Sequence, residues 1–171
     1  MANFVLTVLG DDRPGLVDNL SGVVTAHGGN WERSQMARLG GKFAGIVQVV
    51  VPDARVDELR TALRALNDEG LLQVDIHAAG IAPDADGARF VLSLVGTDRP
   101  GLVHSVSAAL AEVGASIEEL DTATSEAPMS GGPLFEATAA VVLPTGVTIE
   151  AVRDQLEALA DRLMVDIDVV H

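Results

Sequence analysis

GDDRPGLV at residues 10–17 and GTDRPGLV at residues 96–103 are the same eight-residue phrase with one letter changed, 86 positions apart. Each phrase follows a run of alternating apolar residues, which is typical of a strand, and precedes apolar residues at helical spacing. A repeat at this distance in a chain of 171 residues predicts two copies of one domain.

The repeat extends beyond the phrase. In each copy the helical segment stops at a glycine, Gly28 or Gly114, as expected for a left-handed C-terminal cap. Two strand-like segments, a second helical segment and a short strand containing Val-Asp-Ile follow. In the first copy, Gly40-Gly41 predicts a two-residue hairpin between the strands, whereas the longer segment 126–133 separates them in the second copy.

Each half therefore has the order β-α-β-β-α-β. The right-handed crossover rule folds this order into a four-stranded antiparallel sheet with two helices on one face, the α+β ferredoxin-like architecture. We predict domains at residues 1–79 and 88–171, joined by a linker at 80–87 that is rich in Gly, Pro and Asp. Apolar spacing predicts the core-facing residues of the first helix of each copy as Leu16, Leu20 and Val23, and as Val103, Val106, Leu110 and Val113.

Charge and composition exclude several classes of protein. The net charge of -14 is divided into -3 for residues 1–80 and -11 for residues 81–171, so the second half would repel a nucleic acid. The apolar runs fall short of the roughly 20 residues of a membrane helix. The chain starts without signal-peptide features and contains no cysteine, which predicts a cytoplasmic protein without disulfides or thiolate metal sites.

In the repeated phrase, proline fixes φ and moves the preceding arginine out of the helical region, so the helix starts at or after the proline. The adjacent glycine lets a ligand or another backbone come close. The first helix amides then point without partners above the end of the strand, and the helix dipole favours an anion there. In the alternative interpretation Asp12 and Asp98 cap the helices, Arg13 and Arg99 are solvated, and the phrase is only a good turn.

The repeated phrase, inside this order of elements, resembles the ACT domain, a small module that binds amino acids and regulates metabolism. Both halves match, so the resemblance covers nearly the whole chain. Residues 30–44 and 127–137 also resemble the hairpins of the glycine cleavage system transcriptional repressor family, which is built from tandem ACT domains.

This resemblance implies a ligand at an interface between two domains, with its carboxylate on backbone amides of the strand–helix loop. The polar residue that opens the next strand often joins the site, and here it is Asn30 in the first copy but the shorter Ser116 in the second. The two sites are therefore expected to differ. The implied loop residues are Asp12, Arg13, Pro14, Gly15 and Leu16 in the first copy and Asp98, Arg99, Pro100, Gly101 and Leu102 in the second.

Other polar residues indicate no second chemistry. The four histidines have no metal-binding spacing, and residues 84–87 lack most ligands of a calcium loop. His104 follows the second phrase and could reach a ligand, but a solvated or packed histidine is favoured. We expect His27 to interact with the helix C-terminal dipole, and Trp31 to pack in a core or interface. No catalytic motif appears.

The sequence thus predicts a non-enzymatic protein, without metal or cofactor, that senses a small amino acid of the glycine or serine type. By resemblance, its target is a DNA-binding transcription regulator that it contacts directly, and the acidic second half favours a basic partner surface. The alternative is a structural interaction module with empty sites, whose exposed sheet edges pair into a continuous sheet or a homodimer. A small enzyme, supported only by His104, ranks last.

Overall fold

A computed structural model describes residues 1–80 and 86–170. The chain divides into two compact units, Met1–Ala82 and Pro83–His171, which are described separately below. Most of the predicted linker, residues 81–85, lies outside the described residues. Within the described part, no helix has the length and apolar character needed to cross a bilayer.

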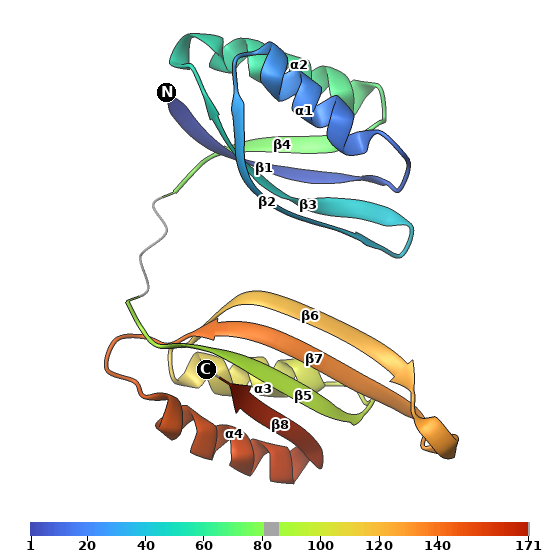
Figure 1. Ribbon diagram of the computed structural model, residues 1–171, viewed down its shortest axis with the longest axis vertical. Helices are drawn as coiled ribbons and strands as arrows, with labels where there is room; N and C mark the ends of the chain where they lie inside the picture. Colours follow the sequence, from blue (N-terminus) through green and yellow to red (C-terminus); the bar gives the residue numbers. More distant parts are fainter. Residues whose placement is uncertain (81–85, 171) are drawn as a thin grey trace. The chain divides into compact units, whose positions relative to one another are not determined.

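The first domain is a four-stranded antiparallel sheet with both helices on one face (Figure 1). The sheet order is β2-β3-β1-β4, which leaves β2 and β4 at the edges. Its elements are β1 (Ala2–Asp11), α1 (Leu16–Ala26), β2 (Asn30–Leu39), β3 (Lys42–Val51), α2 (Val56–Asp68) and β4 (Gln73–Ala78).

The second domain repeats this topology, with the order β6-β7-β5-β8 and edges at β6 and β8 (Figure 1). The ferredoxin-like fold predicted from the sequence is therefore confirmed in both halves. Its elements are β5 (Arg89–Thr97), α3 (Leu102–Glu112), β6 (Ser116–Glu126), β7 (Pro133–Val142), α4 (Ile149–Leu163) and β8 (Val165–Val170).

Each domain has its own core between sheet and helices, because alternate strand residues and one stripe of each helix face inward. The sheet contributes Phe4, Leu6 and Val8 to the first core, and Phe90, Leu92 and Leu94 to the second. The predicted helix stripes were partly wrong. In α1 the third buried residue is Val24, with Val23 half-buried, and in α3 Leu102 is buried whereas Val103 is 43% exposed.

The turns follow the glycine signals. Gly40 and Gly41 both have positive φ, 58° and 76°, and close the tight β2–β3 hairpin. Gly28 and Gly114 are left-handed after α1 and α3, as predicted. His27 also behaves as expected, because its Nδ1 lies 2.7 Å from the carbonyl oxygen of Val23 in the last turn of α1.

Candidate functional site

The repeated phrase forms the same strand–turn–helix connection in both domains. Gly15 precedes α1 with φ 89°, and Gly101 precedes α3 with φ 93°. The first helical hydrogen bonds run from the Asn19 amide to the Gly15 carbonyl and from the Ser105 amide to the Gly101 carbonyl, each 2.9 Å. The three amides ahead of each bond have no acceptor within their helix, and no side chain caps either N-terminus.

The two glycines of the phrase have different structural tasks. A Cβ on Gly15 or Gly101 would meet no atom within 4 Å, so these positions need glycine for positive φ and not for close packing within the domain. The close approach occurs at the first glycine, because a Cβ on Gly10 would lie 2.9 Å from the Leu71 carbonyl oxygen. Space at Gly15 therefore gives no support to a small ligand.

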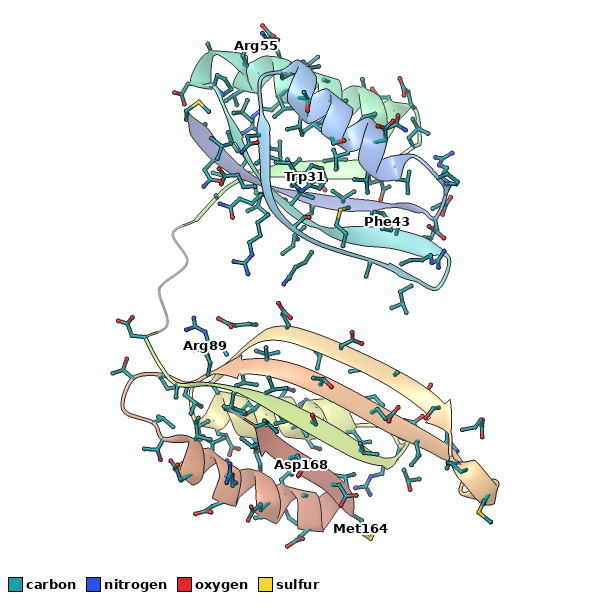
Figure 2. The ribbon with its side chains drawn as sticks, in the orientation of Figure 1. Trp31, Phe43, Arg55, Arg89, Met164 and Asp168 are labelled. Atoms are coloured by element: carbon teal, nitrogen blue, oxygen red, sulfur yellow. The ribbon has the colours of Figure 1, made fainter. Side chains whose placement is uncertain are left out.

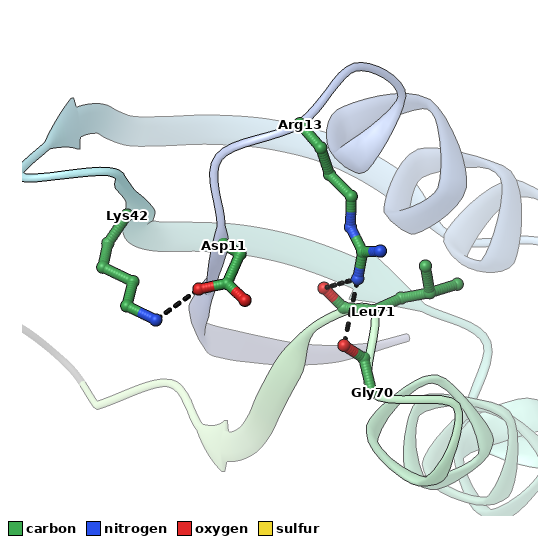
Figure 3. Close-up of polar contacts among 5 residues, drawn as sticks. All are labelled: Asp11, Arg13, Lys42, Gly70 and Leu71. Atoms are coloured by element: carbon green, nitrogen blue, oxygen red, sulfur yellow. Dashed lines mark hydrogen bonds and ion pairs between the residues drawn. The ribbon is translucent and has the colours of Figure 1, made fainter.

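The arginines of the phrase tie the loop to the end of the second helix. Arg13 donates through one terminal nitrogen to the carbonyls of Gly70 at 3.0 Å and Leu71 at 3.4 Å (Figure 3). Arg99 donates in the same way to the carbonyl of Leu163, the last residue of α4. Arg13 is exposed, as the alternative interpretation expects of a solvated side chain, whereas Arg99 is half-buried. Through these hydrogen bonds both act as struts that hold the loop.

The aspartates of the phrase do not cap the helices, so this part of the alternative interpretation is wrong. The Asp12 carboxylate lies 3.3 Å from the Arg38 guanidinium at the end of β2, and its backbone amide donates to the Gly41 carbonyl. The Asp98 amide makes the equivalent bond to the Pro133 carbonyl, 2.9 Å away. Both aspartates are thus held beside their hairpins.

Asp11, the residue before Asp12, has no acidic counterpart in the second domain. Asp11 is exposed and pairs with the Lys42 ammonium across the β1–β3 ladder (Figure 3). The hydrogen bond from Lys42, and then its charge, lower the pKa of the Asp11 carboxyl from its ordinary value of 3.8. The second domain has Thr97 at the corresponding position.

Asn30 and Ser116 lie at the opposite end of their own sheets from these loops. Asn30 pairs with Val50, which pairs with Asn3 near the start of β1, eight residues before the end of that strand. At roughly 3.3 Å per residue, about 26 Å separates Asn30 from the loop of its own domain. Ser116 stands in the same relation to residues 98–101. No single domain brings all of its predicted site residues together.

Among the remaining predicted residues, side-chain burial separates two groups. Leu16 and Leu102 are only 4% and 3% exposed, so they can offer a ligand their backbone amides and not their side chains. Pro14 is exposed and Pro100 also lies at the exposed loop. The surfaces available for recognition at each loop are therefore mainly backbone donors.

The structure contains a small apolar pocket in the second domain, which the repeated phrase did not predict. It has a volume of about 50 Å³ and lies between α3 and the sheet, with Val103, Ile117 and Leu120 among its lining residues. In the first domain, Trp31 takes the position that corresponds to Ile117 and packs against the core (Figure 2). Replacement of an indole by a smaller side chain explains why α3 and β6 leave a gap.

His104 is exposed and lines a groove between α3 and α4 with Glu112 and Arg162. Within residues 1–80 and 86–170, no group of His, Cys, Asp and Glu side chains is arranged to hold a metal ion. Residues 84 and 85 of the calcium-like segment discounted above lie outside the described part.

Comparisons with known proteins match both halves. The profile of the ACT domain family aligns with residues 2–77 and again with residues 88–170. A search of the curated proteins gives no match.

Two solved structures match almost the full length of the chain. A protein of unknown function from Galdieria sulphuraria is 33% identical, with a TM-score of 0.81 over 99% of this chain and 97% of that one. A candidate glycine cleavage system transcriptional repressor is 19% identical, with a TM-score of 0.71 over 98% of this chain and 95% of that one. Each alignment spans both domains of this chain.

Proposed function

Because the chain belongs to the ACT domain family in both of its halves, we propose that it is a non-enzymatic regulatory protein that senses an amino acid. The ligand is a small amino acid of the glycine or serine type, bound at the loops that precede α1 and α3. Binding changes the affinity of the protein for a partner protein, which is allostery in the strict sense of two coupled equilibria.

The observation that carries this proposal is that the first backbone amides of α1 and α3 have no hydrogen-bond acceptor within their helices. At each loop three backbone amides precede the first helical hydrogen bond, directly after a glycine in the left-handed conformation. Such donors bind a carboxylate, since the helix dipole adds a favourable charge. The Asp12 or Asp98 carboxylate, or a loop carbonyl, supplies the acceptor for the ligand ammonium.

The arginine struts support this assignment. An arginine is the usual partner of a carboxylate, but Arg13 and Arg99 are occupied by carbonyls of their own domains. They hold the loop and leave recognition to the backbone amides. Asn30 and Ser116 lie about 26 Å from the loops of their own domains, so neither can join the loop of its own domain around one small ligand.

The protein partner is proposed to be a DNA-binding transcription regulator. Similarity to a candidate glycine cleavage system transcriptional repressor supports a regulatory role. The charge of -11 on residues 81–171 favours a partner with a basic surface.

A thermal-shift series tests the proposal. Glycine and serine at one hundred times their dissociation constant should stabilise the protein by about 2.7 kcal/mol. Glycinamide and ethanolamine, which keep the amine and lack the carboxylate, should give no shift if helix amides hold the carboxylate.

Matched variants locate the sites. Val17→Pro and Val103→Pro each delete one of the free amides in a first helical turn, where proline is tolerated, and both side chains are largely exposed. Val17→Ala and Val103→Ala keep the amides and serve as controls. Loss of the shift in a proline variant alone assigns binding to that loop.

The second candidate function is an interaction module without a ligand. It is favoured by the long exposed edge strands β2 and β6. If no common amino acid at millimolar concentration changes the melting temperature, the sensor proposal fails and this candidate takes its place.

A further inference from the structure

We propose that the groove between α3 and α4 of the second domain binds a linear ω-amino acid. The carboxylate of this ligand lies at His104 and Arg162, and its ammonium group lies at Glu112. The site is built from side chains of the two helices and uses no backbone amide of the strand–helix loops. It therefore stands or falls independently of the function proposed above.

The groove follows the contact between two antiparallel helices, which lie side by side on one face of the sheet (Figure 1). Arg99, just before α3, donates to the carbonyl of Leu163, so the start of α3 lies beside the end of α4. At the other end, the Gln155 amide donates to the Glu112 carboxylate at 3.2 Å. The groove has a volume of about 450 Å³, which is in the range of small-molecule sites.

The two ends of the groove carry different charges. His104 lies in the first turn of α3 and Arg162 in the last turn of α4, so both line the same end. Glu112, the last residue of α3, lines the other end. Eight helical residues separate His104 from Glu112, which corresponds to about 12 Å along the helix axis. A ligand that reaches both ends must be elongated, with a negative group at one end and a positive group at the other.

Arg162 is the cation of the second domain that is free to bind a ligand. Arg89 forms an ion pair, and Arg99 and Arg153 donate to backbone carbonyls. Within the described part of the chain, neither Arg162 nor the His104 ring has a hydrogen bond or an ion pair. A carboxylate at this end gains a guanidinium and an imidazole donor, and no existing contact has to break.

The remaining lining residues specify the rest of the ligand. One guanidinium balances one negative charge, so a carboxylate fits this acidic half of the chain better than a phosphate dianion does. The Glu112 carboxylate accepts from Gln155 through one oxygen and keeps its other oxygen for an ammonium group. Between the ends the groove is lined by Ala108, Ala109 and Leu159, whose apolar side chains suit a chain of methylene groups.

The first domain does not repeat this charge pattern. When the two copies are aligned on the repeated phrase and on the buried residues of α2 and α4, Asp18 corresponds to His104 and Glu69 to Arg162. Two acidic side chains at this end of the helix pair would repel a carboxylate. The proposal is therefore confined to the second domain.

A titration of the full chain with 8-aminooctanoate, followed by amide NMR, tests the site. The largest changes in chemical shift are expected at Ala108 and Ala109, which line the middle of the groove. The probe 8-hydroxyoctanoate lacks the ammonium group and 8-amino-1-octanol lacks the carboxylate, so each should bind about three- to tenfold more weakly. Equal affinity for the three probes, or no change at the groove up to the solubility limit of 8-aminooctanoate, would overturn the proposal.

A pair of charge variants tests the cationic end. Arg162→Gln removes a guanidinium that makes no hydrogen bond within the described part, so the fold should be unaffected. It should weaken binding of 8-aminooctanoate about three- to tenfold. Arg89→Gln removes the same charge from β5, outside the groove, and should have no effect. An unchanged affinity in Arg162→Gln, or an equal loss in both variants, would contradict the assignment.

Two further variants test the acidic end and the middle. Glu112→Gln keeps an acceptor for Gln155 and should weaken 8-aminooctanoate while leaving 8-hydroxyoctanoate unchanged. Ala109→Val introduces the side chain that the first domain has at the corresponding Val23, and it should weaken both probes by narrowing the groove. Circular dichroism verifies that Ala109→Val is folded. Full binding by the folded variant would place the probe outside the groove and overturn the proposal, whether or not an amino acid binds at the loops.

Discussion

The two domains share a fold and a strand–helix loop but differ in the packing and charge of their edge strands β2 and β6. In the first domain, Trp31 packs against the core, and β2 carries a net positive charge. In the second, Ile117 leaves a pocket beside α3, and β6 is strongly acidic. The loop that makes the family recognisable was kept in duplicate, while the edge that can meet another domain differs between the copies.

The largest expected effects separate the two cores. Leu6→Ala and Leu92→Ala remove equivalent buried side chains, 0% and 2% exposed, and should each cost about 2–5 kcal/mol in the domain concerned. Trp31, the only tryptophan, reports the first domain by fluorescence, and circular dichroism reports both. In urea, Leu6→Ala should shift the fluorescence transition and Leu92→Ala should not. A fluorescence shift in Leu92→Ala would show that the domains unfold as one unit.

The arginine struts test whether the two loops are held equally. Arg99 is part-buried, so Arg99→Ala should destabilise the second domain by about 1–2 kcal/mol, and the more exposed Arg13→Ala should cost the first domain about half as much. Urea unfolding followed by circular dichroism measures both. Arg13→Lys and Arg99→Lys keep the positive charge but lack the guanidinium group. They therefore separate the contribution of the charge from that of the hydrogen bonds to the carbonyls. Equal losses would remove this difference between the domains.

The pocket beside α3 can be filled to make the second domain more like the first. Ile117→Phe adds volume where Trp31 stands in the other copy and should stabilise the second domain by about 0.5–1 kcal/mol. The denaturation midpoint by circular dichroism measures this gain, with Ile117→Val as the smaller control. A loss of stability would show that the pocket is too tight for an aromatic ring.

The smallest expected effect is a pH difference. Lys42 lowers the pKa of Asp11, so the pair stabilises the first domain above the ordinary pKa of 3.8, and this contribution is lost as pH falls through the lowered pKa. The second domain has Thr97 there and should show no such step. NMR titration of the Asp11 carboxyl should give a pKa below 3.8 that returns to the ordinary range in Lys42→Gln. An unchanged pKa in that variant would exclude the pair.

Local signals predicted most of the fold correctly. Alternation in β1 and β5, helix-ending glycines and the Gly40-Gly41 hairpin are each fixed by neighbours along the chain. The predicted core-facing side of α3 was wrong by one residue at Val103. The left-handed Gly101 sets the start of α3 so that Leu102 faces inward instead. A backbone rotation of this kind is not visible in apolar spacing alone.

The candidate site was harder to predict, because its contacts are distant in sequence. Arg13 binds the carbonyls of Gly70 and Leu71, which are 57 and 58 residues away along the chain. Arg99 binds the carbonyl of Leu163, which is 64 residues away. The position of Asn30 follows from strand register, which places it at the far end of the sheet from the loop it was expected to join. Adjacency to a motif in sequence did not predict adjacency in space.

The arginine struts have a consequence for evolution. If Arg13 and Arg99 are committed to holding their loops, the repeated phrase can persist unchanged while the residues that distinguish one ligand from another drift. Specificity would then be inherited through positions such as Asn30 and Ser116, which lie outside the phrase and at the opposite end of the sheet. Two relatives with the same Asp-Arg-Pro-Gly phrase could therefore answer to different metabolites.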